Sequence, residues 1–254
     1  MTYLRNQNAN TNFCSSKGAK ETIDILVIEK ALTDTHLVIG QITKNIPVDV
    51  FSILGMRNLS AFIGELFAAS LIKESNGKYI KNPHQDGYPD LLLMNASGTA
   101  AYAKLERAGQ LRDKGPFSPF ADGGLEIKAT CGSVPTPAVC QKKGQQKPGI
   151  GDTRIGLMKS YDWKAHHQET KNLIGIFWDF HDRVPHIIAV FFGNNLIKND
   201  WGGIIQPKTG GGRTTSVSIM TRLGVKKMYS NWLVVEKDPR YTKFFNTYNN
   251  GKIM

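Results

Sequence analysis

The chain is short of cysteine, of acidic residues and of long apolar runs, and each shortage excludes a class of protein. Its three cysteines cannot all pair and form no C-x-x-C motif, so a disulfide scaffold and structural zinc are not expected. Apolar runs such as residues 187–192 are too short to cross a bilayer, and residues 1–16 lack the basic and then apolar pattern of a signal peptide. We therefore expect a cytoplasmic protein with free thiols and no membrane partner.

The shortage of acid leaves 32 Lys and Arg against 21 Asp and Glu, a formal net charge of +11. This balance favours a polyanionic partner over a neutral metabolite, and nucleic acid is the natural choice. The basic residues are spread along the chain without a long amphipathic basic helix, which argues against binding to a membrane surface. With 254 residues, 41% of them hydrophobic, the chain can bury a substantial core.

We divide the sequence into a flexible arm over residues 1–20 and a single domain over residues 21–254, with an insertion at about 95–124. Helical and strand patterns are interspersed along the domain, which predicts the α/β (α+β) class with a helical amino-terminal part. Helices are expected over 59–72 and 99–111, strands near 78–81, 173–178 and 187–192, and a final helix and strand within 225–248.

Two stretches carry the candidate chemistry. Residues 87–94 place Asp90 directly before three leucines, and residues 123–130 alternate apolar residues with Glu126 and Lys128. Successive side chains of a strand point to opposite faces, so Glu126 and Lys128 share one face and their apolar neighbours point to the core. If Asp90 ends a neighbouring strand, its carboxylate joins Glu126 to hold Mg²⁺, which prefers oxygen ligands, and Lys128 faces the attacking water. The alternative is a buried strand with charges at its edge.

The acid-x-Lys pattern is weak evidence by itself, because it also occurs at residues 162–164 and 169–171. Only the triplet at 126–128 follows a Gly-Gly turn signal and alternates with apolar residues. The other two sit in or beside the polar run 164–172, which reads as helix or loop. Context therefore favours the triplet at 126–128.

Further polar side chains admit two interpretations. Glu65 lies beside the apolar stripe of the predicted helix 59–72, where it is either a solvated carboxylate or an auxiliary acid near the metal. His166 and His167 are adjacent on a helix or loop and make a poor chelating pair. We interpret them, together with His181, as structural or close to DNA.

Two loops offer side chains to a polyanion. The segment 131–153 is too polar to pack in a core, and its candidates are Gln141, Lys142, Lys143, Gln145, Gln146 and Lys147. Consecutive glycines in the second loop let the backbone approach a ligand closely, and the residues after them offer donors to base edges and phosphates. Its candidates are Gly211, Gly212, Arg213, Thr214, Thr215 and Ser216. The same composition also fits a flexible linker.

Together these pieces resemble the PD-(D/E)XK nucleases, and more narrowly the orthodox type II restriction endonucleases of the EcoRV kind. The resemblance spans roughly residues 59–220 with unmatched segments between, and it rests on Glu-Leu-Phe at 65–67, Tyr-Pro-Asp at 88–90, acid-Ile-Lys-x-Thr at 126–130 and the glycine-bearing loop 210–216. It implies a restriction-endonuclease-like core, a mixed central sheet flanked by helices. Three features depart from the pattern: Glu126 stands where that relative has Asp, and neither the insertion nor the longer helical amino-terminal part has a counterpart.

The resemblance also implies roles for single residues. Asp90 and Glu126 would ligate Mg²⁺, with Mn²⁺ able to substitute, and the Ile127 carbonyl would complete the shell. Lys128 would orient or help to deprotonate the nucleophilic water. Glu65 would serve a second metal or act through water.

The implied function is a type II site-specific deoxyribonuclease that cuts both strands of duplex DNA at a short palindromic sequence as a homodimer. Arg213 would read guanine, and a cognate DNA methyltransferase would belong to the same system without a stable complex. Two alternatives stay open. One is a structure-specific repair or junction-resolving nuclease of the same fold, and the other is a non-catalytic basic DNA-binding protein.

Overall fold

The computed structural model describes residues 2–207 and 216–248, and its described part centres on a seven-stranded mixed sheet. Neighbouring strands are antiparallel except β6 and β8, which pair in parallel with Glu126 beside Leu173. From one edge to the other the order is β1 (Tyr3–Arg5), β11 (Trp232–Glu236), β9 (Val184–Gly193), β8 (Leu173–His181), β6 (Gly124–Thr130), β5 (Leu91–Leu93) and β4 (Tyr79–Lys81). The predicted mixed sheet in an α/β fold is confirmed.

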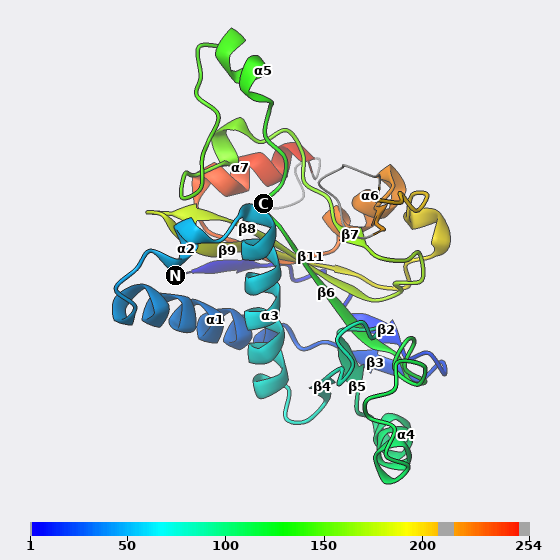
Figure 1. Ribbon diagram of the computed structural model, residues 1–254. Coiled ribbons are helices and arrows are strands. Elements are labelled where there is room, and N and C mark those ends of the chain that lie inside the picture. The colour runs from blue at the N-terminus through cyan, green and yellow to red at the C-terminus, as the bar shows by residue number, and fades with distance from the viewer. Residues whose placement is uncertain (1, 208–215, 249–254) are drawn as a thin grey trace.

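Helices cover both faces of this sheet (Figure 1). α1 (Ile25–Asn45) and α3 (Met56–Glu74) pack on one face, and α6 (Arg222–Ser230) and α7 (Pro239–Tyr248) pack on the other. Because both faces are covered, the central strands β8 and β9 are buried along almost their whole length and read as continuous apolar runs rather than alternating ones.

The two long helices follow from caps and apolar spacing. The Asp24 carboxylate accepts a hydrogen bond from the Leu26 N–H and so begins α1. Buried residues recur every three or four positions on each helix, which gives one apolar stripe toward the sheet. The stripe of α1 includes Ile28, Leu32 and Ile39, and that of α3 includes Leu59, Ile63, Phe67 and Leu71.

Residues 2–20 contribute strands, so the prediction of a flexible arm is wrong for them. β1 pairs with β11 at the edge of the main sheet, and β2 (Asn12–Cys14) forms a hairpin with β3 (Lys20–Thr22). The Tyr3 hydroxyl donates a hydrogen bond of 2.6 Å to the Ile187 carbonyl. Strands of three residues depend on partners distant in the sequence, and local composition does not reveal such partners.

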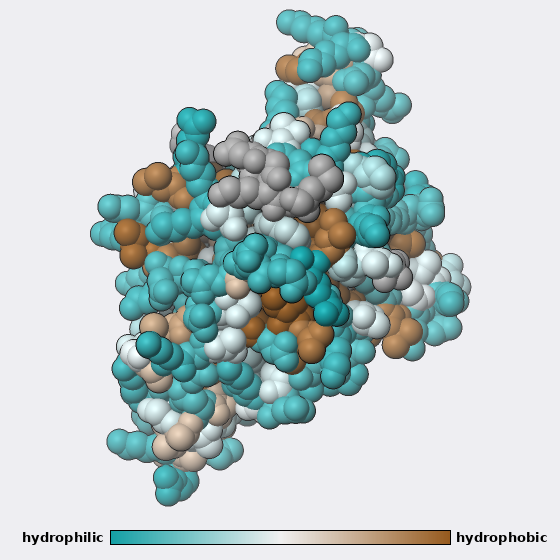
Figure 2. Space-filling model, turned by 180° about the vertical axis from the view of Figure 1, so that it is seen from behind, coloured by the Kyte–Doolittle hydropathy of each residue, from teal (hydrophilic) through white to brown (hydrophobic). Residues whose placement is uncertain are grey.

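The insertion projects from the body of the molecule, opposite the projecting segment around α5 (Pro137–Lys142), and both views show it (Figures 1 and 2). It begins with α4 (Ala96–Arg107), which starts earlier than predicted because the Asn95 side chain accepts a hydrogen bond from the Gly98 N–H. The chain then continues without regular structure to Gly123. Its rings Phe117 and Phe120 stack on each other at 6.0 Å and pack beside β5.

The remaining elements are short: α2 (Val50–Ile53), η1 (Ile155–Leu157), η2 (Lys198–Asp200) and the strands β7 (Lys164–Ala165) and β10 (Ser218–Ile219), which pair with each other. His166 and His167 follow β7 in a bend and not in a helix. Within residues 2–207 and 216–248, no helix combines the length and the apolar character needed to span a membrane.

Candidate active site

Asp90, Glu126 and Lys128 lie together, as predicted, and we call them the site triad. Lys128 Nζ is 2.6 Å from Glu126 Oε1 and 3.0 Å from Asp90 Oδ2. The main chain adds two further contacts, because the Ile127 N–H donates to Asp90 Oδ2 at 2.9 Å and the Asp90 N–H donates to Glu126 Oε2 at 3.2 Å. Both carboxylates are therefore held by an ammonium and by a backbone donor.

This arrangement arises because the pairing between β5 and β6 stops after two residue pairs. β5 pairs with β6 only through Leu91 opposite Leu125 and Leu92 opposite Gly124, so Asp90 stands where the pairing stops and takes the next N–H of β6. A Cβ atom at Gly124 would lie 1.9 Å from the Leu91 carbonyl oxygen, so only glycine allows this approach. Alternate residues of a strand point their backbone groups to alternate edges, so the Ile127 carbonyl faces the same open edge as its N–H.

The insertion fixes the loop that carries Asp90. Asn82 is buried, and its side chain donates hydrogen bonds of 3.0 Å to the carbonyls of Pro89 and Phe117. The Asn82 N–H donates to the Asp90 carbonyl at 2.9 Å, and the Tyr88 N–H donates to the Phe117 carbonyl at 2.7 Å. The position of Asp90 thus depends on residues 95–124 as well as on β6.

Burial and charge set the protonation of the site triad. Burial raises the pKa of Glu126 to about 7, the Asp90 carboxylate adds to this rise, and Lys128 opposes it. Burial acts to lower the pKa of Lys128, but the two carboxylates outweigh that effect and the pKa is raised overall. Lys128 is therefore a stable ammonium between two carboxylates, and Glu126 exchanges its proton near neutral pH.

A cleft of about 1590 Å³ opens over this place, with Asp90, Lys128 and the carboxyl-terminal half of β6 in its lining. α3 forms one wall, residues 81–87 form another, and residues 162–166 with 205, 206 and 217 lie across from them. Its further basic residues are Arg57, Lys81 and Lys164. Against these three cations stand the acidic Glu65 and Asp162, so beyond the site triad the lining carries only a slight excess of positive charge.

Glu65 lines the same cleft but does not join the site triad. Its carboxylate is exposed and pairs with Lys81 Nζ at 2.6 Å. Within the part of the chain that the structure describes, no hydrogen bond or ion pair links Glu65 to Asp90, Glu126 or Lys128. Its role as an auxiliary acid stays a prediction.

The two predicted DNA-binding loops differ in how far the structure describes them. Residues 141–147 are exposed on the projecting segment around α5, outside the lining of the cleft. Gly211 to Thr215 lie outside the described residues. The Ser216 carbonyl lies 3.1 Å from His166 Nδ1, and the nearby Gln206 and Val217 line the cleft.

The triplet Asp162-Trp163-Lys164, which the sequence analysis sets aside, also belongs to the cleft. Asp162 and Lys164 are in the lining, and the Trp163 ring between them is buried. Burial raises the pKa of Asp162, and Lys164 opposes the rise. Strand β7 depends on a partner more than fifty residues away in β10, so the local pattern indicated only helix or loop. The acid-x-Lys spacing of residues 162–164, which repeats that of the site triad, was the one sequence signal that could have pointed to this part of the cleft.

The donor set fits magnesium. A single cation, the Lys128 ammonium, already lies within 3.0 Å of both Asp90 and Glu126 oxygens, so one ion at this place can reach both carboxylates. The Ile127 carbonyl faces the same edge and adds a third oxygen of the kind that Mg²⁺ prefers. Water in the cleft can supply the remaining ligands.

Comparison with known proteins finds no relative of this chain. The chain matches no protein-family model, and no significant similarity is found to curated proteins or to solved structures. A functional argument therefore depends on the geometry and chemistry of the cleft and the site triad.

Proposed function

We propose that the protein is a magnesium-dependent endonuclease with a restriction-endonuclease-like core, and specifically a type II site-specific deoxyribonuclease. One observation carries the proposal: Lys128 Nζ lies within 3.0 Å of both the Asp90 and the Glu126 carboxylates at the open edge of β6. The net charge of +11 and the lysine and arginine side chains that line the cleft support a nucleic-acid substrate.

Asp90, Glu126 and the Ile127 carbonyl are the residues that would hold Mg²⁺. The ion, when bound, supplies positive charge for the scissile phosphate and the leaving oxygen. Lys128 pairs with both carboxylates in the structure. Once the carboxylates hold the ion, the Lys128 ammonium would be free to orient the attacking water by donating a hydrogen bond to it.

Duplex DNA is the proposed substrate, and a homodimer is the proposed active form. Each protomer would cut one strand, because two copies of one site related by a twofold axis match the two strands of a palindrome. Arg57, Lys81 and Lys164 offer cations to the phosphates. Base readout is assigned to the loop at 211–216, and a cognate DNA methyltransferase is the expected companion.

The test is cleavage of plasmid and genomic DNA with Mg²⁺ or Mn²⁺. We expect discrete, reproducible fragments that disappear when the metal is chelated. Lys128→Ala and Asp90→Asn should each lower the cleavage rate at least about 100-fold while DNA binding persists. The matched control is Lys171→Ala, which alters the exposed lysine of the Glu169-Thr170-Lys171 triplet outside the cleft and should cut normally.

Two outcomes would support the alternatives. Cleavage of branched or damaged DNA with no discrete fragments from plasmid would favour a junction-resolving or repair nuclease. DNA binding without cleavage in either metal, with Lys128→Ala equal to wild type, would favour a non-catalytic DNA-binding protein and overturn the nuclease proposal.

A further inference from the structure

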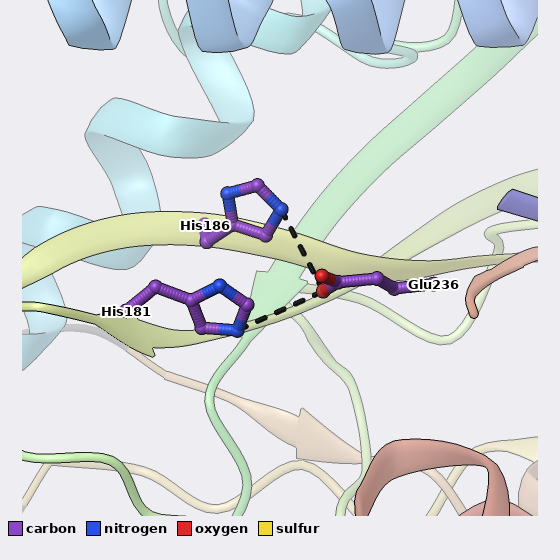
Figure 3. A group of neighbouring side chains, drawn as sticks. All are labelled: His181, His186 and Glu236. Atoms are coloured by element: carbon purple, nitrogen blue, oxygen red, sulfur yellow. Dashed lines mark ion pairs between the residues drawn. The ribbon is translucent and has the colours of Figure 1, made fainter. Parts of the chain in front are cut away.

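A second cluster of ionisable side chains lies at the far end of the central sheet. His181 ends β8, His186 lies on β9 and Glu236 ends β11. Figure 3 shows both imidazole rings next to the Glu236 carboxylate. His181 Nε2 is 3.7 Å and His186 Nε2 is 3.6 Å from Glu236 Oε2, and one ligand atom from each side chain lies within 4.8 Å of the others.

Two atoms of this cluster are buried and unsatisfied. Among the described residues, neither His186 Nε2 nor Glu236 Oε2 has a hydrogen-bond partner, and His186 is 5% exposed. Unpaired buried polar atoms are costly, so the arrangement calls for a group that satisfies both. A shared proton does not bridge 3.6 Å, which exceeds the length of a hydrogen bond. Ligand atoms around a tetrahedral zinc ion stand about 3.4 Å apart, close to the 3.7 and 3.6 Å between the two histidines and Glu236 Oε2.

Stacked rings hold the His186 imidazole, and burial favours the neutral form of both histidines. The His36 ring stacks on His186 at 4.1 Å, and His186 stacks on His181 at 4.4 Å. The Ile187 N–H donates to His36 Nε2 and fixes the first ring of the stack. Burial lowers the pKa of His186 to about 2 and also lowers that of His181. Neutral imidazole is the form that ligates metals.

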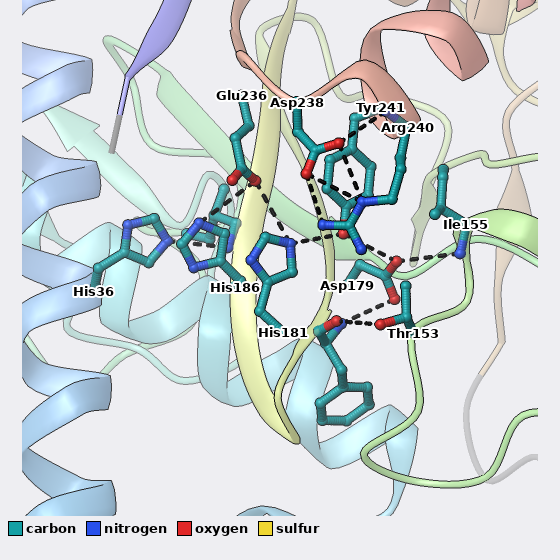
Figure 4. A network of polar contacts seen from close by, with 12 residues as sticks. His36, Thr153, Ile155, Asp179, His181, His186, Glu236, Asp238, Arg240 and Tyr241 are labelled. Atoms are coloured by element: carbon teal, nitrogen blue, oxygen red, sulfur yellow. Dashed lines mark hydrogen bonds and ion pairs between the residues drawn. The ribbon is translucent and has the colours of Figure 1, made fainter.

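The outer contacts of His181 run through Tyr241 to Asp179 (Figure 4). The Tyr241 hydroxyl lies 2.7 Å from His181 Nε2 and 3.3 Å from the buried Asp179 Oδ2. When Nε2 takes an ion, the hydroxyl can donate to Asp179 alone and keep a partner. His181 is also the most exposed of the three ligands, with 24% of its side chain exposed, which leaves a path for the ion.

We propose that His181, His186 and Glu236 bind one transition-metal ion, Zn²⁺ by the chemistry of the donors, which clamps β8, β9 and β11 together. Two imidazoles and one carboxylate are a donor set that Zn²⁺ accepts, with a fourth position for water, whereas Mg²⁺ prefers oxygen ligands alone. The scarcity of cysteine excludes only the thiolate type of zinc site.

This site is separate from the nuclease centre. Lys128 stands beside Gly175 of β8, and from Gly175 to His181 the strand rises about 20 Å at 3.3 Å per residue. The zinc site therefore does not depend on the proposed nuclease activity, and each can fail without the other.

The experiment uses the full chain, stripped with a chelator and then dialysed against Zn²⁺ alone. We expect one zinc per chain by elemental analysis. The thermal midpoint should rise by about 5 °C or more when free Zn²⁺ exceeds the Kd a hundredfold. Co²⁺ in place of Zn²⁺ should give the visible absorption of a four-coordinate ion.

Variants decide which residues hold the ion. Glu236→Gln keeps the shape of the side chain and offers its amide to His186, so it should fold and still lose at least about 100-fold in zinc affinity. His181→Ala should show the same loss. His166→Ala, which removes an exposed histidine outside the cluster, should bind normally. Asp90→Asn should also bind normally, because it alters only the magnesium centre.

Two results would overturn the site. One is a wild-type chain that retains no zinc and shows no rise in thermal midpoint. The other is zinc binding of unchanged affinity in both Glu236→Gln and His181→Ala, which would place the ion elsewhere on the chain.

Discussion

At the scale of single residues, the buried carboxylate of Glu126 controls how the site triad responds to pH. Burial and the neighbouring Asp90 raise its pKa to about 7, so below that pH a proton would compete with the proposed Mg²⁺ for the same oxygens. We predict that the Mg²⁺ concentration for half-maximal cleavage rises about tenfold per pH unit below 7 and levels off above it. Titrations with Mg²⁺ at pH 6, 7 and 8 measure this, and an equal requirement at all three would contradict it.

Glu236 makes a second residue-scale prediction. Burial raises its pKa from 4.5 to about 7, so between these values the folded state binds more protons than the unfolded state. Its contribution to stability is therefore present below about pH 4.5 and is lost as the pH rises through 7. With a chelator present to remove metal, the stability of Glu236→Gln relative to wild type should be about 2 kcal/mol higher at pH 8 than at pH 4.5. Urea unfolding at pH 4.5 and pH 8 measures the unfolding free energies. The same change with pH in the variant and in wild type would refute the prediction.

At the scale of elements, the short pairing of β5 with β6 decides where Asp90 stands. Gly124→Ala places a Cβ atom 1.9 Å from the Leu91 carbonyl oxygen and must force the two strands apart. We expect a loss of about 2–3 kcal/mol in stability and a fall in cleavage rate of at least about tenfold, because Asp90 moves away from Glu126. Chemical unfolding and cleavage assays measure the two effects.

The control for that prediction lies in the same region of the chain. A Cβ atom at Gly115 meets no other atom within 4 Å, so Gly115→Ala should change stability by no more than about 0.5 kcal/mol. Equal losses in the two variants would show that the β5–β6 approach is not what positions Asp90.

The elements also show which parts of the fold can be read from the sequence. β6 and α3 carry complete local patterns, alternation in one and an apolar stripe in the other, and both were predicted at nearly their observed positions. β1 and β7 have two or three residues and owe their structure to β11 and β10, so no local pattern indicates them.

The same distinction holds for the sites. The proximity of Asp90, Glu126 and Lys128 could be predicted from the sequence. The strand pattern placed Glu126 and Lys128 on one face, and the apolar run after Asp90 placed it at the end of a neighbouring strand. Glu236 and His186 come from different strands far apart in the sequence and meet only because β9 and β11 are neighbours. No spacing rule links them, so the cluster was missed and His181 was interpreted as structural or close to DNA.

At the scale of the whole molecule, the net charge of +11 would govern encounter with the proposed DNA substrate. Each phosphate neutralised adds about −0.9 to the slope of log K against log salt, so we predict that Lys164→Ala reduces the slope by about one. Affinity should weaken equally for all sequences, since a phosphate contact carries no base information. Lys171→Ala, outside the cleft, should keep the wild-type slope. Binding assays over a range of salt on two unrelated duplexes measure this, and a loss confined to one sequence would contradict it.

The open edge of β6 leaves one oxygen of the proposed magnesium centre in the peptide backbone. Replacing Ile127 by another apolar residue does not remove that carbonyl, so alanine scanning cannot detect its contribution. Backbone chemistry, such as an ester in place of the peptide bond, is needed to probe it. Chains that share this strand ending would present the same oxygen whatever side chain they carry there, and alignments of such chains would give no hint that the position takes part.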